Sequence, residues 1–265
     1  MHGRTHGLSN KGPCFAKWAL AAALYAVLMP AEARSLDEII RTHTFDLCAV
    51  RENMPFSADE GPARGALVEL GAAVAQRLGV ESKISWLFSA EYARKTDCDA
   101  IPAVAAIPDD DPLRLTIPYL KVRTVVVVRS RHRAVASVDD LRTDTVAVLA
   151  ESWARHLLNM AHLNLKVAFL QSGEILAAVA NGDADAGVVT LPYFEWYHHE
   201  HPESDLRAED RYVIDPSLDY VAAFGLRHAD IETVKTFNQI LTALIADGSI
   251  SRIFARYGMR YEPPS

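Results

Sequence analysis

The strongest constraint on the fold is an alternation of short buried strands with amphipathic helices along most of the chain. The first unit shows the pattern: an apolar strand at 45–50 is followed by a polar loop with Pro55. Apolar residues then recur at helical spacing over 67–78, and Gly79 ends the helix. Strands that alternate with helices in this way predict an α/β protein whose sheets are covered by helices.

Two long apolar strands indicate that the chain builds two sheets instead of one. Four consecutive valines at 125–128 suit a strand buried on both faces, and residues 220–226 form a second apolar strand. Because a separate α/β series lies between them, we predict two lobes, each a mainly parallel sheet flanked by helices, joined by two crossing strands. The predicted boundaries are 34–123 for the first part of lobe one, 124–220 for lobe two and 221–265 for the return to lobe one.

The N-terminus has the three parts of a secretory leader. Basic residues precede an uninterrupted apolar run at 18–29, and Ala-Glu-Ala follows at 31–33. A membrane anchor is the alternative, but this run is shorter than the roughly 20 residues that span a bilayer. We therefore predict a signal peptide at 1–33, an exported protein, and no membrane span after cleavage.

Composition excludes some classes of function. The net charge is −7 and the sequence has no basic stripe, which argues against nucleic-acid binding. Half of the residues are hydrophobic, which favours a packed core over disorder.

Two cysteines, Cys48 and Cys98, remain after the predicted leader. In an oxidising compartment paired thiols usually close into a disulfide, which the sequence therefore favours. Two buried free thiols stay open as the alternative.

Seven short features stand in the order in which one protein family has them. They are Met-Pro-Phe-Ser at 54–57, the helix at 67–79, Asp99 with the small residues after it, Pro-Tyr at 118–119, Val-Asp-Asp-Leu at 138–141, Gly-Asp-Ala-Asp-Ala at 182–186 and the closing segment at 247–258. From about Leu36 to Met259, the chain thus resembles the family 3 extracellular solute-binding proteins. The resemblance implies the type II periplasmic binding fold, a periplasmic location and a small-molecule ligand.

Within this family, the chain resembles one subgroup more closely. Cys48 before Pro-Phe-Ser, together with Cys98 before Asp99, resembles homologues associated with methanol and other quinoprotein dehydrogenases, in which the two cysteines lie on neighbouring strands and can bond. The resemblance implies an ABC permease as partner, or a periplasmic quinoprotein dehydrogenase with its cytochrome c. We expect a monomer with no cofactor.

The family holds its ligand between the lobes, at strand ends and helix N-termini where free backbone N–H groups favour anions. Carried over by motif, the ligand-binding residues are Arg51, Asn53, Phe56, Ala106, Tyr119, Ser152, Trp153, Thr190 and Tyr193. For Trp153 and Tyr193, packing in the core is the alternative to stacking on a flat ligand. For Arg51, a surface charge or salt bridge is the alternative to a ligand anchor.

Amino-acid binders of this family use two charged anchors that this sequence lacks. The arginine about 12 positions past the strand aspartate falls on Asp111, with Arg114 three places later. The aspartate after Gly-x-x-Asp-Ala falls on Thr190. A buried zwitterion would keep two uncompensated charges, so we predict a ligand that is not an ordinary amino acid.

Two other clusters favour ordinary surface structure over a metal site. Adjacent side chains at 198–201 point apart on a helix, and the acidic run at 109–111 has no calcium-loop glycine. We predict no metal site and no catalytic residue. The enzyme alternative is a cyclohexadienyl dehydratase-like protein on the same fold, with Glu52 as its candidate acid.

Overall fold

The computed structural model describes residues 35–106, 113–227 and 229–264. The predicted leader and the acidic run at 109–111 lie outside these residues. Among the described helices, none is both long and apolar enough to cross a membrane.

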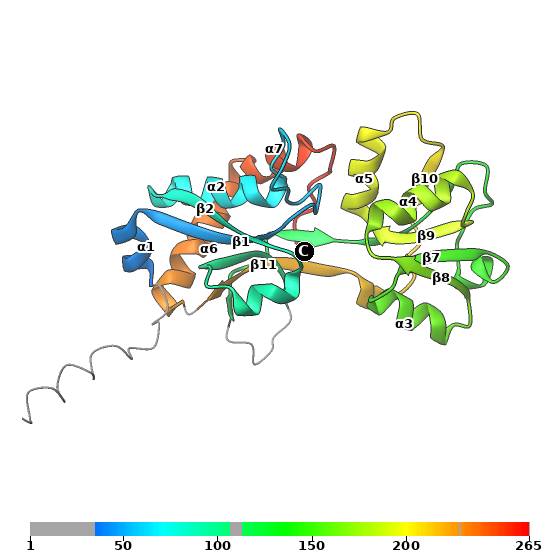
Figure 1. Cartoon of the computed structure of the whole chain (residues 1–265), viewed down its shortest axis with the longest axis horizontal. Coiled ribbons are helices and arrows are strands. Elements are labelled where there is room, and N and C mark those ends of the chain that lie inside the picture. The colour runs from blue at the N-terminus through cyan, green and yellow to red at the C-terminus, as the bar shows by residue number, and fades with distance from the viewer. Residues whose placement is uncertain (1–34, 107–112, 228, 265) are drawn as a thin grey trace, which may run out of the picture. The chain divides into compact units, whose positions relative to one another are not determined.

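The first sheet has the strand order β2-β1-β3-β11-β4, with β5 also paired to β11 (Figure 1). Its strands are β1 (Thr44–Val50), β2 (Glu81–Leu87), β3 (Ala100–Ala105), β4 (Leu113–Leu115), β5 (Leu120–Val122) and β11 (Tyr220–Arg227). β1 runs parallel to β2 and β3, whereas β11 is antiparallel to β3, β4 and β5. We call this sheet and its helices the first lobe.

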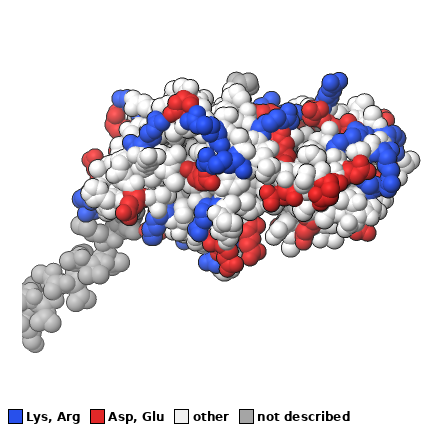
Figure 2. All heavy atoms as spheres, turned by 90° about the horizontal axis from the view of Figure 1, so that it is seen from above, with Lys and Arg blue, Asp and Glu red and all other residues white. Residues whose placement is uncertain are grey.

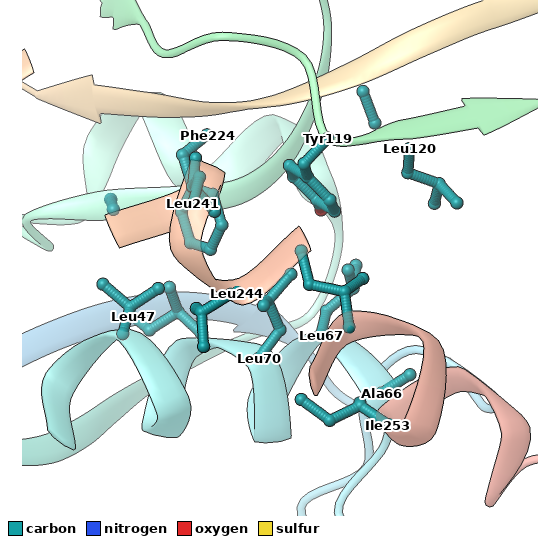
Figure 3. Close-up of a cluster of buried hydrophobic side chains, with 14 of the residues drawn as sticks. Leu47, Ala66, Leu67, Leu70, Tyr119, Leu120, Phe224, Leu241, Leu244 and Ile253 are labelled. Carbon is teal, nitrogen blue, oxygen red and sulfur yellow. The ribbon is translucent and has the colours of Figure 1, made fainter. Parts of the chain in front are cut away.

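The helices of the first lobe bury one continuous core against this sheet. They are α1 (Leu36–Thr42), α2 (Ala66–Leu78), η1 (Ala90–Lys95), α6 (Ile231–Ala246) and α7 (Ser249–Ala255). Figure 3 shows Leu47 of β1, Leu70 of α2 and Leu244 of α6 meeting in this core, where all three are buried. A Cβ on Gly71 would lie 2.6 Å from the Leu47 side chain, so glycine lets α2 approach β1 closely.

The second sheet has the order β10-β6-β9-β7-β8. Its strands are β6 (Thr124–Arg129), β7 (Thr145–Leu149), β8 (Asn164–Phe169), β9 (Ala186–Thr190) and β10 (Leu206–Glu209). Its helices are η2 (Val138–Leu141), α3 (Trp153–Met160), α4 (Ser172–Asn181), α5 (Leu191–Glu200) and η3 (Pro216–Leu218). We call these elements the second lobe.

The valine strand is buried on both faces, as the sequence predicts. Val125 and Val127 belong to the core under α4, whereas Val126 and Val128 belong to the core under α3. Alternate side chains of a strand point to opposite faces, so β6 joins two hydrophobic layers.

The prediction of two sheets linked by two crossing segments is confirmed, but the sheets are mixed where mainly parallel ones were expected. β7 is parallel to β8 and β9, while β6 is antiparallel to β9 and β10. The antiparallel ladders arise because β6 and β11 enter each sheet from the other lobe. The added partners β4, β5 and β10 are too short to give a sequence signal.

The two crossing segments lie side by side. β5 pairs with β11, with Val122 opposite Tyr220. Just past this ladder, Thr124 donates its backbone N–H to the Asp219 carboxylate over 2.8 Å. The Thr124 hydroxyl donates to the Leu218 carbonyl over 2.9 Å. The lobes are therefore connected through a single two-stranded link.

A C-terminal segment, residues 259–264, braces this link. The backbone N–H of Lys121 donates to the Glu262 carbonyl, and the Arg123 guanidinium holds the Glu262 carboxylate with two bonds of 2.7 and 2.8 Å. Arg260 donates its backbone N–H to Glu195 of α5 over 2.8 Å. The segment thus contacts the crossing strands and the second lobe at the same time.

Cys48 and Cys98 form a disulfide, which confirms the pairing over the free-thiol alternative. Both side chains are buried beside Leu87 and Ala93, and the bond closes a loop with a sequence separation of 50 residues. It ties β1 to the chain that enters β3.

We predict that replacing both cysteines with alanine lowers the free energy of unfolding by about 4 kcal/mol, because the reduced chain regains the entropy of this loop. Urea unfolding of the double variant and of the oxidised protein measures the difference. The reduced wild-type protein should match the variant. Equal midpoints for oxidised and reduced protein would contradict the prediction.

We predict that Glu262→Gln destabilises the fold by roughly 1.5 kcal/mol at neutral pH, because charged hydrogen bonds to Arg123 are lost. These bonds hold the pKa of Glu262 below its ordinary value of 4.5. The stabilisation is therefore full above about pH 4.5 and is lost as the pH falls through the lowered pKa. Unfolding curves between pH 3 and 8 test this, with the exposed Glu232→Gln as control.

Candidate functional site

The main cleft lies where loops at the carboxyl ends of strands in both sheets face one another, the usual place for a ligand in open α/β sheets. The first lobe contributes the loops after β1 and β2, and the second contributes the end of β7, the start of α4 and one side of α5. The cleft has a volume of about 630 Å³. Its lining residues are Val50, Arg51, Glu52, Asn53, Met54, Phe88, Ser89, Leu149, Leu170, Gln171, Ser172, Gly173, Tyr193 and Trp196.

The loop after β1 is held in place by backbone hydrogen bonds. Arg51 N–H donates to the Leu87 carbonyl over 2.9 Å, and Asn53 N–H donates to the Ser57 carbonyl over 2.8 Å. The Ser57 hydroxyl donates back to Val50 over 2.6 Å. These bonds fix where the side chains of the loop meet the cleft.

Gly65 lets the same loop pack on the start of α2. A Cβ there would lie 2.4 Å from the backbone of Phe56, and the Gly65 backbone has a φ of +95°. Both observations require glycine. The Gly65 N–H donates to the Tyr257 hydroxyl over 2.9 Å, which itself donates to Glu69. Burial together with the Glu69 bond raises the pKa of Tyr257 to about 12.

Arg51 lines the cleft, but its charge already has a partner. Its guanidinium lies 3.1 Å from Asp59 and 5.2 Å from the centre of the Phe88 ring. The side chain is 44% exposed. Arg51 is thus an ion-paired residue of the cleft lining, which agrees with the salt-bridge interpretation, and its role as a ligand anchor stays a prediction.

Three predicted site residues meet across the lobes. The Tyr193 hydroxyl of α5 donates to the Asn53 side-chain oxygen, and the Tyr193 ring packs edge-on against Phe56 with centroids 5.3 Å apart. Burial raises the pKa of Tyr193, and the nearby Tyr220 raises it further. Tyr193 therefore stays a neutral hydrogen-bond donor at physiological pH.

Tyr119 is a core residue instead of a cleft residue. Its side chain is fully buried, packs against Phe224, and donates its hydroxyl to the Pro102 carbonyl over 2.6 Å (Figure 3). The motif places Tyr119 next to the crossing strand, but its ring turns inward because the first lobe has its core there.

Of the four remaining predicted residues, three have hydrogen-bond partners within the protein. Ser152 caps α3, accepting from Arg155 N–H and donating to Leu149, and Ala106 N–H donates to Val221. Trp153 is 55% exposed, stacks on His156 of its own helix and donates its indole N–H to Ser217, so it packs on its own helix but outside the core. Thr190 precedes α5 as its N-cap residue, and its buried hydroxyl has no hydrogen-bond partner among the described residues. None of these four lines the main cleft or the inner recess described below.

Sequence reasoning missed two exposed apolar side chains that line the cleft. Phe88 follows β2 and is 81% exposed, and Leu170 follows β8 and is 80% exposed. A large apolar residue directly after a strand, where polar turn residues are usual, is the signal that marks both.

A smaller recess of about 230 Å³ lies behind the main cleft in the first lobe. The two cavities share Val50, Asn53 and Tyr193. Its lining residues are Cys48, Ala49, Val50, Asn53, Phe56, Ser57, Leu67, Leu87, Ala93, Ile101, Pro102, Ala103, Leu120, Val122, Tyr193, Tyr220 and Ala222.

At the two anchor positions, Thr190 carries no charge and Asp111 lies outside the described residues. The nearby Arg114 is an exposed residue of β4 that pairs with Leu226 of β11 and lines neither cavity. Among the residues with described positions, no group of three or more His, Cys, Asp or Glu side chains could hold a metal ion. His198 and His201 instead pack against aromatic rings of their own helix.

Charges of both signs are spread over the surface. Figure 2 shows basic and acidic side chains interspersed on the face that it presents.

Comparison with known proteins agrees with this architecture. A family model described as bacterial extracellular solute-binding proteins, family 3, matches residues 47–260. A Haemophilus influenzae protein named "Probable amino-acid ABC transporter-binding protein" is 26% identical over 82% of this chain and 85% of its own length. A Bacillus subtilis protein named as a probable amino-acid-binding protein is 30% identical over 65% of this chain and 69% of its own length.

A solved structure has the same fold at low sequence identity. It is that of an ancestral amino-acid-binding protein described as a precursor of cyclohexadienyl dehydratase, with a TM-score of 0.66 and 19% identity. The match covers 84% of this chain and 99% of that one. Because the family match spans most of the sequence and the two-sheet fold agrees with it, this chain belongs to the bacterial extracellular solute-binding proteins of family 3.

Proposed function

We propose that this protein is a periplasmic solute-binding protein that captures a small molecule between its lobes and delivers it to an ABC permease. The observation that carries the proposal is the cleft of about 630 Å³ lined by loops of both sheets. Tyr193 of the second lobe already touches Asn53 and Phe56 of the first. A ligand between these loops would contact both lobes, as capture by closure requires.

On ligand binding, two units would move relative to each other. Residues 34–123 and 221–265 form the first unit, and residues 124–220 form the second. Closure would flex the paired segments β5 and β11, since they are the link between the two sheets. The bond from Arg123 to Glu262 and the contact of Arg260 with Glu195 limit that motion.

The ligand is not an ordinary amino acid. Among the described residues, Arg51 and Glu52 are the only charged side chains that line the main cleft; both are exposed, and Arg51 is paired with Asp59. An α-carboxylate and an α-ammonium buried deeper, in the recess without charged lining, would lack fixed opposite charges, at several kcal/mol each. This sets the protein apart from what the names of its two relatives say of them.

A role beside a periplasmic quinoprotein dehydrogenase and its cytochrome c is the second candidate. The Cys48–Cys98 bond, which the resembling subgroup can form, and the missing amino-acid anchors favour it. Co-elution with such a dehydrogenase would distinguish docking from delivery to a permease. The dehydratase-like alternative has weaker support, because Glu52 is the only carboxylate among the described residues that line the cleft.

We predict that the protein recovered from the periplasm starts at Arg34. The apolar run and the Ala-Glu-Ala site that precede this residue are typical of a leader removed on export. Intact-mass measurement of the periplasmic fraction checks this. Recovery of the full-length chain from the cytoplasm would contradict it.

We predict that a solute screen by thermal unfolding finds a compound that raises Tm by about 5 °C or more, since saturation at 100 Kd adds about 2.7 kcal/mol of stability. The panel holds alcohols, aldehydes, organic acids, cations and the twenty amino acids, and the amino acids should leave Tm within about 1 °C.

Tyr193→Ala should abolish the shift, because a side chain that lines both cavities and can hydrogen-bond the ligand is lost. Tyr197→Ala, one turn later on the same helix and outside both cavities, is the matched control. A panel with no active compound would contradict the capture proposal, and an active amino acid would contradict the ligand class.

A further inference from the structure

The inner recess has walls without a charged side chain. None of the residues that line its volume of about 230 Å³ is Asp, Glu, Lys, Arg or His. Most of the lining side chains are aliphatic, many of them from strands β1, β3, β5 and β11, and the buried Cys48 of the disulfide also lines the recess. A charged group placed there would lose its hydration with no opposite charge in return.

The polar groups of the recess stand together on one side. Asn53 and Tyr193 are hydrogen-bonded to each other where the recess meets the main cleft, and Tyr220 lines the recess near them. The Ser57 hydroxyl is already donated to the Val50 carbonyl. One end of an occupant can therefore form hydrogen bonds, while the rest of it faces apolar wall.

The volume limits the occupant to a small molecule. An apolar cavity of about 150 Å³ is large enough for benzene, so this recess suits a single ring with one substituent or an aliphatic molecule of similar size. A ligand with several polar groups would leave hydrogen bonds unmade against the aliphatic wall.

We infer that the recess binds a small, uncharged and mainly apolar molecule with one hydroxyl or carbonyl group, which replaces the Tyr193–Asn53 contact at its polar end. The inference rests on the proposed function and specifies its ligand class. Tyr193 comes from the second lobe, whereas the remaining wall belongs to the first lobe and the crossing strands. Occupancy of the recess would thereby be coupled to the position of the second lobe.

Four uncharged probes test the inference: benzyl alcohol, benzaldehyde, cyclohexanol and 1-butanol. Benzoate and benzylamine are charged counterparts that keep the shape of benzyl alcohol. Isothermal titration calorimetry and saturation-transfer NMR measure binding to the mature, disulfide-bonded protein. We expect at least one uncharged probe to bind, and benzoate and benzylamine to bind at least 10-fold more weakly.

Filling the recess tests its location. Ala103→Leu places a larger side chain into the cavity from β3 and should weaken binding of the active probe at least 10-fold. Ala73→Leu makes the same change at a half-buried position of α2 that packs on the first-lobe core outside both cavities, and should leave affinity within twofold. Ile101→Phe is a second filling variant, for use if Ala103→Leu lowers the melting temperature of the free protein strongly.

Each outcome supports or overturns the inference. The inference is supported if an uncharged probe binds more tightly than benzoate and benzylamine, and if this binding is lost in Ala103→Leu and kept in Ala73→Leu. Charged and uncharged probes of equal affinity, or a filled recess that still binds, would overturn it. So would a failure of all four uncharged probes at millimolar concentration while another solute of the thermal screen binds. In these cases solute capture would stand, whereas a screen without any active compound removes the proposed function itself.

Discussion

The structure depends on the antiparallel pairing of β5 with β11. This short ladder brings the outgoing and returning segments of the chain to one place, and Thr124 extends it by hydrogen bonds to Asp219 and Leu218. Because each side of the link has its own buried core, two lobes form from one chain. The strand ends of both sheets then face a common cleft, and the C-terminal segment adds a brace through Glu262.

The cleft contains few charged side chains, and the polar contact between its two lobes is neutral. Arg51 is paired with Asp59 at the mouth, and the contact between the lobes is a neutral hydrogen bond from Tyr193 to Asn53. Inside that contact the wall is aliphatic and includes Cys48 of the disulfide. The family's fold is thus combined with a recess whose described lining carries no charged side chain.

Much of the α/β framework was predictable because its elements carry their own periodicity. The valine strand, the helix at 67–78 and the strand at 220–226 agree with β6, α2 and β11. The strands β4, β5 and β10 were missed, because three or four residues are too few for a pattern and their pairing depends on distant partners. Asn53, Phe56 and Tyr193 meet as a group, whereas Tyr119 faces the core.

The sequence by itself determined the alternation of elements and the presence of a pair of cysteines, since these are properties of local composition and spacing. Only the tertiary structure decided that the cysteines bond, that Arg51 is neutralised by Asp59, and that Phe88 and Leu170 line the cleft. The physical reason is that a side chain's direction and partners depend on the packing of segments far apart in the chain. No local pattern contains that information.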